Sequence, residues 1–121
     1  MNNTTFFIRL VVLGGCLLIT NTTLNAQSIM NQISPKVNVW DTYVTKKDGG
    51  IMHFDIIAPV SIQDTSQIYQ YGKAYLRSKG QEGQPLSAAQ CRLCHIEQLR
   101  PEWATAIEQN GYFIIEMEGC R

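Results

Sequence analysis

The sequence has no excess of charge of either sign: ten basic and ten acidic residues balance over 121 positions. A protein that neutralises nucleic-acid phosphates carries a basic surplus, and an anionic membrane surface is bound by clusters of Lys and Arg. We therefore expect neither nucleic acid nor a lipid surface among the partners. Long apolar runs are also missing. The longest, residues 10–19, is well below the roughly 20 residues that a membrane-spanning helix needs.

The signatures of the common enzyme families are absent as well. The chain contains no G-x-S-x-G, no H-E-x-x-H and no phosphate-binding loop. It contains no internal repeat, low-complexity tract or linker, and its length suffices for one domain but not for two. These absences leave an enzymatic activity open but favour a binding or structural role.

The N-terminus has the three-part pattern of a secretory signal peptide. Arg9 is followed by the apolar run and then by the polar TNTTLNA, which ends at the small residue Ala26. We predict cleavage after Ala26 and a secreted or periplasmic protein. The stretch Leu13-Gly14-Gly15-Cys16 resembles a lipoprotein cleavage box, so a lipid anchor on Cys16 is the alternative. A second alternative is that translation starts at Met30 and that the residues before it are an upstream extension of the sequence.

Downstream of residues 1–26, we expect a short polar leader over 27–35 and a single domain over 36–121. Within that domain, KVNVWDTYVT and IMHFDIIAP flank an Asp-Gly turn signal, which predicts a β-hairpin. If Thr45 faces Ile51, apolar and polar side chains separate onto opposite faces, and we prefer this register for that reason. The polar face then carries Asp41, Tyr43, His53 and Asp55.

Two helices and two further strands complete the domain. Asp64 and Gln67 form a capping-box pattern that opens a helix to about Lys79, and Pro101 opens a second over about 102–109. Residues 93–97 read as a strand, and YFIIEME as the last strand, with Phe113, Ile115 and Met117 facing the core. The order ββαβαβ predicts an α+β domain with a four-stranded, mainly antiparallel sheet and both helices on one face.

The stretch CRLCH, residues 91–95, carries the most chemistry. Two cysteines three apart have a spacing that suits zinc. If the alternation of the last strand continues to Cys120, this residue points away from the core, to the same face of the sheet as His53. We therefore expect a zinc site drawn from Cys91, Cys94, Cys120 and His53, with His95 as the substitute fourth ligand.

Three other interpretations of CRLCH stay open. The Cys91–Cys94 pair could run thiol–disulfide exchange, and CRLCH is also the attachment signature of c-type haem, the least favoured of the interpretations. The cysteines could equally be structural core residues. Apart from CRLCH, a partner could dock on the open sheet face through Tyr43, Tyr112 and Ile114, and Asp41 with Asp55 could serve acid–base chemistry.

Five blocks resemble a known bacterial family, domain of unknown function 2024: VWDTYV (39–44), MHFD (52–55), YGKAYL with KGQEG (71–76 and 79–83), CRLCHIE (91–97) and NGYFIIEMEGC (110–120). The resemblance implies a small α+β domain, in agreement with the element order. It brings no activity and no catalytic residues. Members of that family start close to the first strand and look cytoplasmic, whereas this chain carries the signal-peptide pattern.

Overall fold

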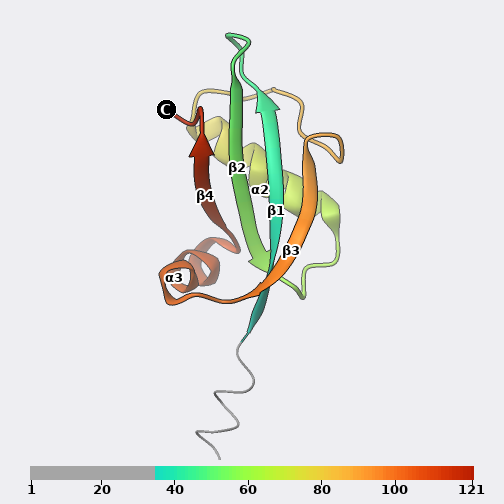
Figure 1. Cartoon of the computed structure of the whole chain (residues 1–121), viewed down its shortest axis with the longest axis vertical. Coiled ribbons are helices and arrows are strands. Elements are labelled where there is room, and N and C mark those ends of the chain that lie inside the picture. Colours follow the sequence, from blue (N-terminus) through green and yellow to red (C-terminus); the bar gives the residue numbers. More distant parts are fainter. Residues whose placement is uncertain (1–34) are drawn as a thin grey trace, which may run out of the picture. The chain divides into compact units, whose positions relative to one another are not determined.

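The computed structural model describes residues 35–121. The expected signal peptide, and all but the last residue of the expected leader, lie outside this range. The elements follow the order ββαβαβ and pair as one antiparallel sheet with strand order β3-β1-β2-β4 (Figure 1). This confirms the predicted α+β class. The bounds are β1 Lys36–Thr45, β2 Ile51–Pro59, α2 Thr65–Ser78, β3 Cys91–Gln98, α3 Pro101–Asn110 and β4 Phe113–Glu118.

The central hairpin has the register that the sequence predicts. Thr45 pairs with Ile51, and Asp41 pairs with Asp55. The register is strongly specified because a slip of one residue would turn every apolar side chain of a strand from the core to solvent. The hairpin loop is closed by Lys46 and Gly50, whose backbone groups form a 2.7 Å hydrogen bond.

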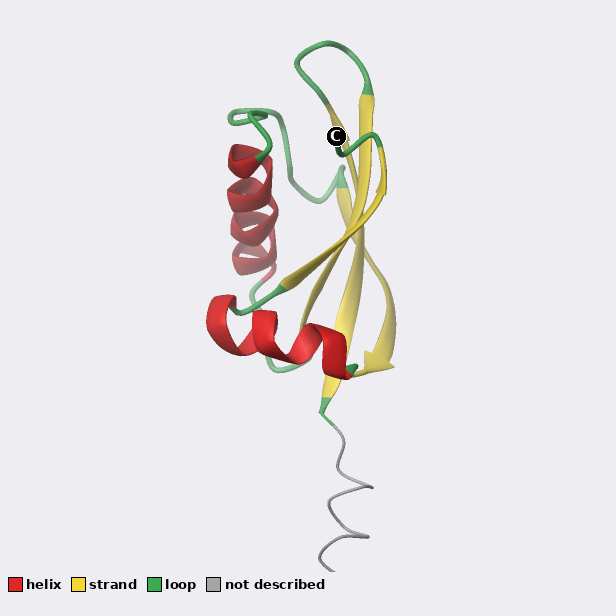
Figure 2. Ribbon diagram, turned by 90° about the vertical axis from the view of Figure 1, so that its left-hand side faces the viewer, coloured by secondary structure: helices red, strands yellow, loops and turns green. Residues whose placement is uncertain are grey.

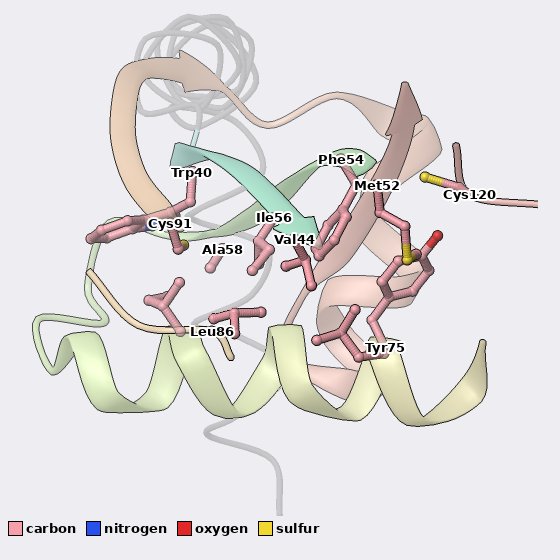
Figure 3. Close-up of a cluster of buried hydrophobic side chains, with 12 residues drawn as sticks. Trp40, Val44, Met52, Phe54, Ile56, Ala58, Tyr75, Leu86, Cys91 and Cys120 are labelled. Atoms are coloured by element: carbon pink, nitrogen blue, oxygen red, sulfur yellow. The ribbon is translucent and has the colours of Figure 1, made fainter. Parts of the chain in front are cut away.

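Helix α2 covers one face of the sheet and encloses the larger hydrophobic core (Figure 3). The helix begins where the carboxylate of Asp64 accepts a 2.9 Å hydrogen bond from the backbone N–H of Ser66, a standard N-cap. Its buried stripe includes Ile68, Gly72 and Leu76, as the helical spacing predicts. The residues of β1 and β2 that face α2 are the even-numbered ones: Trp40, Val44, Met52, Phe54, Ile56 and Ala58.

Helix α3 packs against the opposite set of residues. Its Trp103 is 4% exposed and belongs to a second cluster with Val37, Val39 and Ile57. Successive residues of a strand point to opposite faces of a sheet, so α3 contacts the odd-numbered side chains of β1 and β2, which α2 leaves uncovered. Figure 2 shows α3 near one end of the sheet. The predicted four-stranded antiparallel sheet with two helices is confirmed, but the two helices contact opposite sets of side chains of β1 and β2. Both faces carry apolar side chains at this end, and the sequence does not show which helix takes which face.

The last strand alternates as expected, but its assignment to faces is reversed. Ile114 packs with the α2 core, whereas Phe113 and Ile115 pack in the α3 cluster. Met117, expected in the core, is 55% exposed. Each face of β4 packs against a helix, so the strand carries apolar side chains on both faces. The sequence FIIE therefore does not indicate which residues face α2 and which face α3.

Each edge strand contains a β-bulge. On β3, Leu93 pairs with Trp40 and His95 pairs with Val39, so Cys94 is the extra residue. On β4, Glu116 pairs with Phe54 and Glu118 pairs with His53, so Met117 is the extra residue. A bulge resets the alternation of side chains between the faces. Within residues 35–121, no helix is long and apolar enough to cross a membrane.

Candidate functional site

Four polar side chains gather on the face opposite α2, beyond the area that α3 covers. Asp41 and Tyr43 come from β1, while His53 and Asp55 come from β2. The hairpin register places Asp41 directly across from Asp55, and Tyr43 directly across from His53. The structure thus brings together the polar patch that the register predicts, with His53 as its fourth member.

The patch is tightly connected. Nε2 of His53 lies 2.6 Å from Oδ1 of Asp41, a hydrogen bond between imidazole and carboxylate. The ring of Tyr43 stacks on the imidazole, with ring centroids 4.0 Å apart and planes 12° apart. One ligand atom from each of Asp41, His53 and Asp55 lies within 4.8 Å of the others. All three residues are partly buried, so their side chains reach solvent from one side only.

Negative charge dominates the electrostatics of this patch. Burial raises the pKa of Asp55 above its ordinary value, and the neighbouring Asp41 raises it further, while His53 acts in the opposite direction. Partial desolvation raises the pKa of the Tyr43 phenol, to which the charges of Asp41, Asp55 and Glu118 add. Two carboxylates this close disfavour each other's ionised form. The patch would therefore bind a cation more readily than an anion.

Two further residues, Glu118 and His95, lie beside the patch. Glu118 pairs with His53 only because the Met117 bulge brings it to this face. His95 of β3 pairs with Val39 and so lies on the same face, where its charge acts on Asp55. Its Nε2 is 2.9 Å from Oε1 of Glu97. The outward parity predicted for the last strand also puts Glu118 on the face of His53, but no residue pattern in the sequence signals the bulge at Met117 that brings it there. The face on which His95 lies depends in the same way on the bulge at Cys94.

Cys91 lies in the main core. It pairs with Thr42 at the start of β3, faces α2 and is 2% exposed. Burial raises the pKa of its thiol, although a hydrogen bond with Thr42 opposes that shift. A metal binds the thiolate, which is also the nucleophilic form. Cys91 therefore behaves as a small core residue.

The other two cysteines lie elsewhere. Cys94 is exposed at the β3 bulge, and Cys120 is buried in the α2 core, at the end of the cluster away from Cys91 (Figure 3). Sγ of Cys120 is 3.3 Å from the backbone oxygen of His53, on the other face of β2 from the imidazole. Gly119, with φ +68°, allows the turn that places it: a Cβ there would lie 2.0 Å from the backbone oxygen of Ile51.

The expected zinc ligand set is therefore not assembled. Among the described residues, the only group of three or more His, Cys, Asp or Glu side chains close enough to share an ion is Asp41, His53 and Asp55. The cysteines Cys91, Cys94 and Cys120 are free thiols, two buried and one exposed. Thiol exchange and haem attachment at CRLCH each require both thiols on one accessible surface, and Cys91 does not offer this.

Comparison with known proteins gives a family and a fold. Residues 35–117 match a family described as domain of unknown function, DUF2024. The chain is similar to the NMR structure of protein NE1680 from Nitrosomonas europaea, at 43% sequence identity and a TM-score of 0.62. That match covers 71% of this chain and 99% of the other. The curated proteins gave no match.

The family match spans the whole described domain apart from its last four residues, Glu118 to Arg121, and includes all four members of the polar patch. The family match indicates a fold but no activity, in agreement with the resemblance of the five sequence blocks. The chain belongs to the DUF2024 family.

Proposed function

We propose that the domain binds a divalent transition-metal ion, with Zn²⁺ the first candidate, through Asp41, His53 and Asp55. The observation that carries this proposal is the approach of one imidazole nitrogen and two carboxylate oxygens to within 4.8 Å of one another. A central hairpin holds all three, so their backbone positions are fixed by the two innermost strands of the sheet.

The electrostatics support a cation at this position. Asp41 and Asp55 are directly opposed on neighbouring strands, an arrangement that is destabilising when both are charged. A divalent ion between them removes that repulsion and favours the ionised form of Asp55, whose pKa is otherwise raised. Tyr43, stacked on His53, restricts the orientations that the imidazole can adopt.

Binding requires the ion to replace a proton. At 2.6 Å, His53 and Asp41 share a hydrogen between Nε2 and Oδ1, and this proton must leave before Nε2 can coordinate a metal. Ligand atoms around one zinc ion lie about 2.0–2.2 Å from it, so a small separation of this pair and an approach of Asp55 complete the set. Proton release makes the affinity increase with pH.

The donor set suits some ions better than others. One imidazole and two carboxylates are typical ligands for Zn²⁺ and also suit Mn²⁺ and Fe²⁺, while Mg²⁺ prefers oxygen ligands and keeps several waters. Three protein ligands leave a coordination position for water, the arrangement of catalytic rather than structural zinc. A zinc-activated water is the chemistry that the site would supply if the domain proves to be an enzyme.

Isothermal titration calorimetry with Zn²⁺, Mn²⁺ and Mg²⁺ on the metal-free protein tests the proposal. We expect one equivalent of Zn²⁺ to bind, Mg²⁺ to bind far more weakly, and proton release to appear as a dependence of the heat on the ionisation enthalpy of the buffer. Asp41→Asn, His53→Gln and Asp55→Asn should each weaken zinc binding by at least about tenfold, the lower limit for loss of a metal-site partner.

Two controls separate this site from adventitious binding. Glu108→Gln removes an exposed carboxylate from α3 and should leave the affinity unchanged. Cys94→Ser tests the exposed thiol and should also leave it unchanged. Zinc binding that survives in all three site variants but disappears in Cys94→Ser would overturn the proposal and return the site to the cysteines.

A further inference from the structure

Strand β3 forms an open edge of the sheet. In the order β3-β1-β2-β4 it pairs with β1 on one side, and no strand of residues 35–121 lies on its other side (Figure 1). The five residues from Arg92 to Ile96 are all exposed. Leu93 and Ile96 are 51% and 58% exposed and belong to the few large apolar side chains that reach solvent. Edge strands of this kind pair with a further strand unless they are protected.

The bulge at Cys94 gives β3 an internal symmetry. Leu93 pairs with Trp40 and Ile96 pairs with Asn38, two positions apart on β1, so both point to the α2 face. Arg92 pairs with Asp41 and Glu97 pairs with Val37, so both point to the opposite face. In a regular strand, residues three apart point to opposite faces, and only the bulge places Leu93 with Ile96.

We propose that β3 pairs antiparallel with β3 of a second copy of this chain, around a two-fold axis perpendicular to the sheet. With Cys94 opposite His95 of the partner subunit, Leu93 lies opposite Ile96 of the partner subunit, and Arg92 lies opposite Glu97 of the partner subunit. Each apolar side chain meets an apolar one and each charge meets its opposite. A two-fold axis perpendicular to the sheet leaves the α2 faces of both copies on the same side of the joined sheet. The two residues of each pair therefore point to the same face.

The symmetry of the strand favours a second copy over an unrelated partner. Any extended peptide could pair with the backbone of β3, but CRLCHIEQ contains both halves of the contact itself: basic and acidic, leucine and isoleucine. Such self-complementarity is what an isologous two-fold interface requires. The other edge strand lacks it, because β4 exposes Glu116 and Glu118 around its bulge. The joined sheet has eight strands, and the Asp41–His53–Asp55 groups of both copies lie on the same face.

Sedimentation equilibrium of the complete protein over a range of concentrations measures the association. We expect a reversible dimer. Arg92→Glu sets two pairs of like charges in each dimer and should raise the dissociation constant by about tenfold. The double variant Arg92→Glu with Glu97→Arg restores opposite charges and should restore most of the affinity. Within one subunit, Glu97 contacts His95 and Arg100, so a purely internal role of Glu97 would not give this rescue.

Two further variants complete the design. Ile96→Lys removes an apolar contact and should also weaken the dimer, whereas Lys73→Glu makes an equal charge reversal at an exposed site on α2 and should not. Thermal unfolding followed by circular dichroism checks that all variants fold. A wild-type protein that stays monomeric into the millimolar range overturns the proposal. So does a dimer whose dissociation constant is insensitive to Arg92→Glu.

Discussion

Asp41 and Asp55 face each other across the two central strands, although like charges in directly opposed positions destabilise a sheet. Two features reduce the repulsion. His53 forms a 2.6 Å hydrogen bond with the carboxylate of Asp41, and the raised pKa of Asp55 favours its neutral form. An arrangement that weakens the free domain and suits a cation is typical of a binding site, where stability is often lower than it could be.

The first prediction concerns Asp55→Asn in the metal-free protein. The amide keeps the shape of the side chain and removes one of the two opposed charges. We expect the free energy of unfolding at neutral pH to increase by about 0.5–1 kcal/mol, the range for one unfavourable cross-strand pair. Urea denaturation measures it. An Asp55→Asn protein that is less stable than wild type at neutral pH without metal would contradict the idea of stored repulsion.

The same variant has a defined pH dependence. Because the pKa of Asp55 is higher in the folded state than the unfolded value of about 3.9, the folded state binds this proton more tightly. The stability gained from protonated Asp55 is fully present below the unfolded pKa, and it is lost as the pH rises through the folded pKa. The stability difference between Asp55→Asn and wild type should therefore grow over that interval and level off above it. Denaturation curves at a series of pH values test this.

The second prediction concerns the three thiols. Cys94 is exposed, whereas Cys91 and Cys120 are 2% and 6% exposed. We expect a thiol reagent to modify one cysteine of the domain rapidly in native buffer and the other two only on unfolding. Peptide mass mapping assigns the fast site, and Cys94→Ser should abolish it. Rapid modification of Cys91 would show that CRLCH opens and would revive the redox interpretation.

The third prediction concerns Gly72, which lies on the buried face of α2. A Cβ there would lie 2.5 Å from Cδ1 of Leu86 and 3.1 Å from Cδ1 of Ile56, both in the core. Although alanine is the better helix former, Gly72→Ala should destabilise the domain by about 1–3 kcal/mol because it overpacks the core. Chemical denaturation measures the change. Lys73→Ala, the next residue and exposed, serves as the control and should change stability by less than about 0.5 kcal/mol.

The fourth prediction concerns export. If residues 1–26 act as a signal peptide, the mature protein begins at Gln27, and the metal binding proposed above would take place in a secreted or periplasmic protein. Intact mass measurement of the protein from the producing cell tests this. A mass that includes residues 1–26 would refute cleavage, and an added lipid mass on a chain starting at Cys16 would show a lipoprotein instead.

The hairpin and its polar patch could be predicted from the sequence. Alternation with period two allows one register in which apolar and polar residues separate, and the structure has that register from Thr45 to Trp40. The helix from Asp64 was equally predictable, because a cap and a buried stripe are local signals. These features depend on residues close together in the chain, where side-chain periodicity and hydrogen bonding act directly.

The positions of the cysteines were decided by the tertiary structure. The bulges at Cys94 and Met117 depend on how the two edge strands meet β1 and β2, and each bulge reverses the parity of the residues after it. Cys120 entered the α2 core through the turn at Gly119, away from the imidazole of His53. The sequence alone determined which side chains could bind a metal, because the ability to coordinate an ion depends on the type of residue. Their proximity was set by long-range strand pairing, since a single inserted residue moves a ligand to the other face of the sheet.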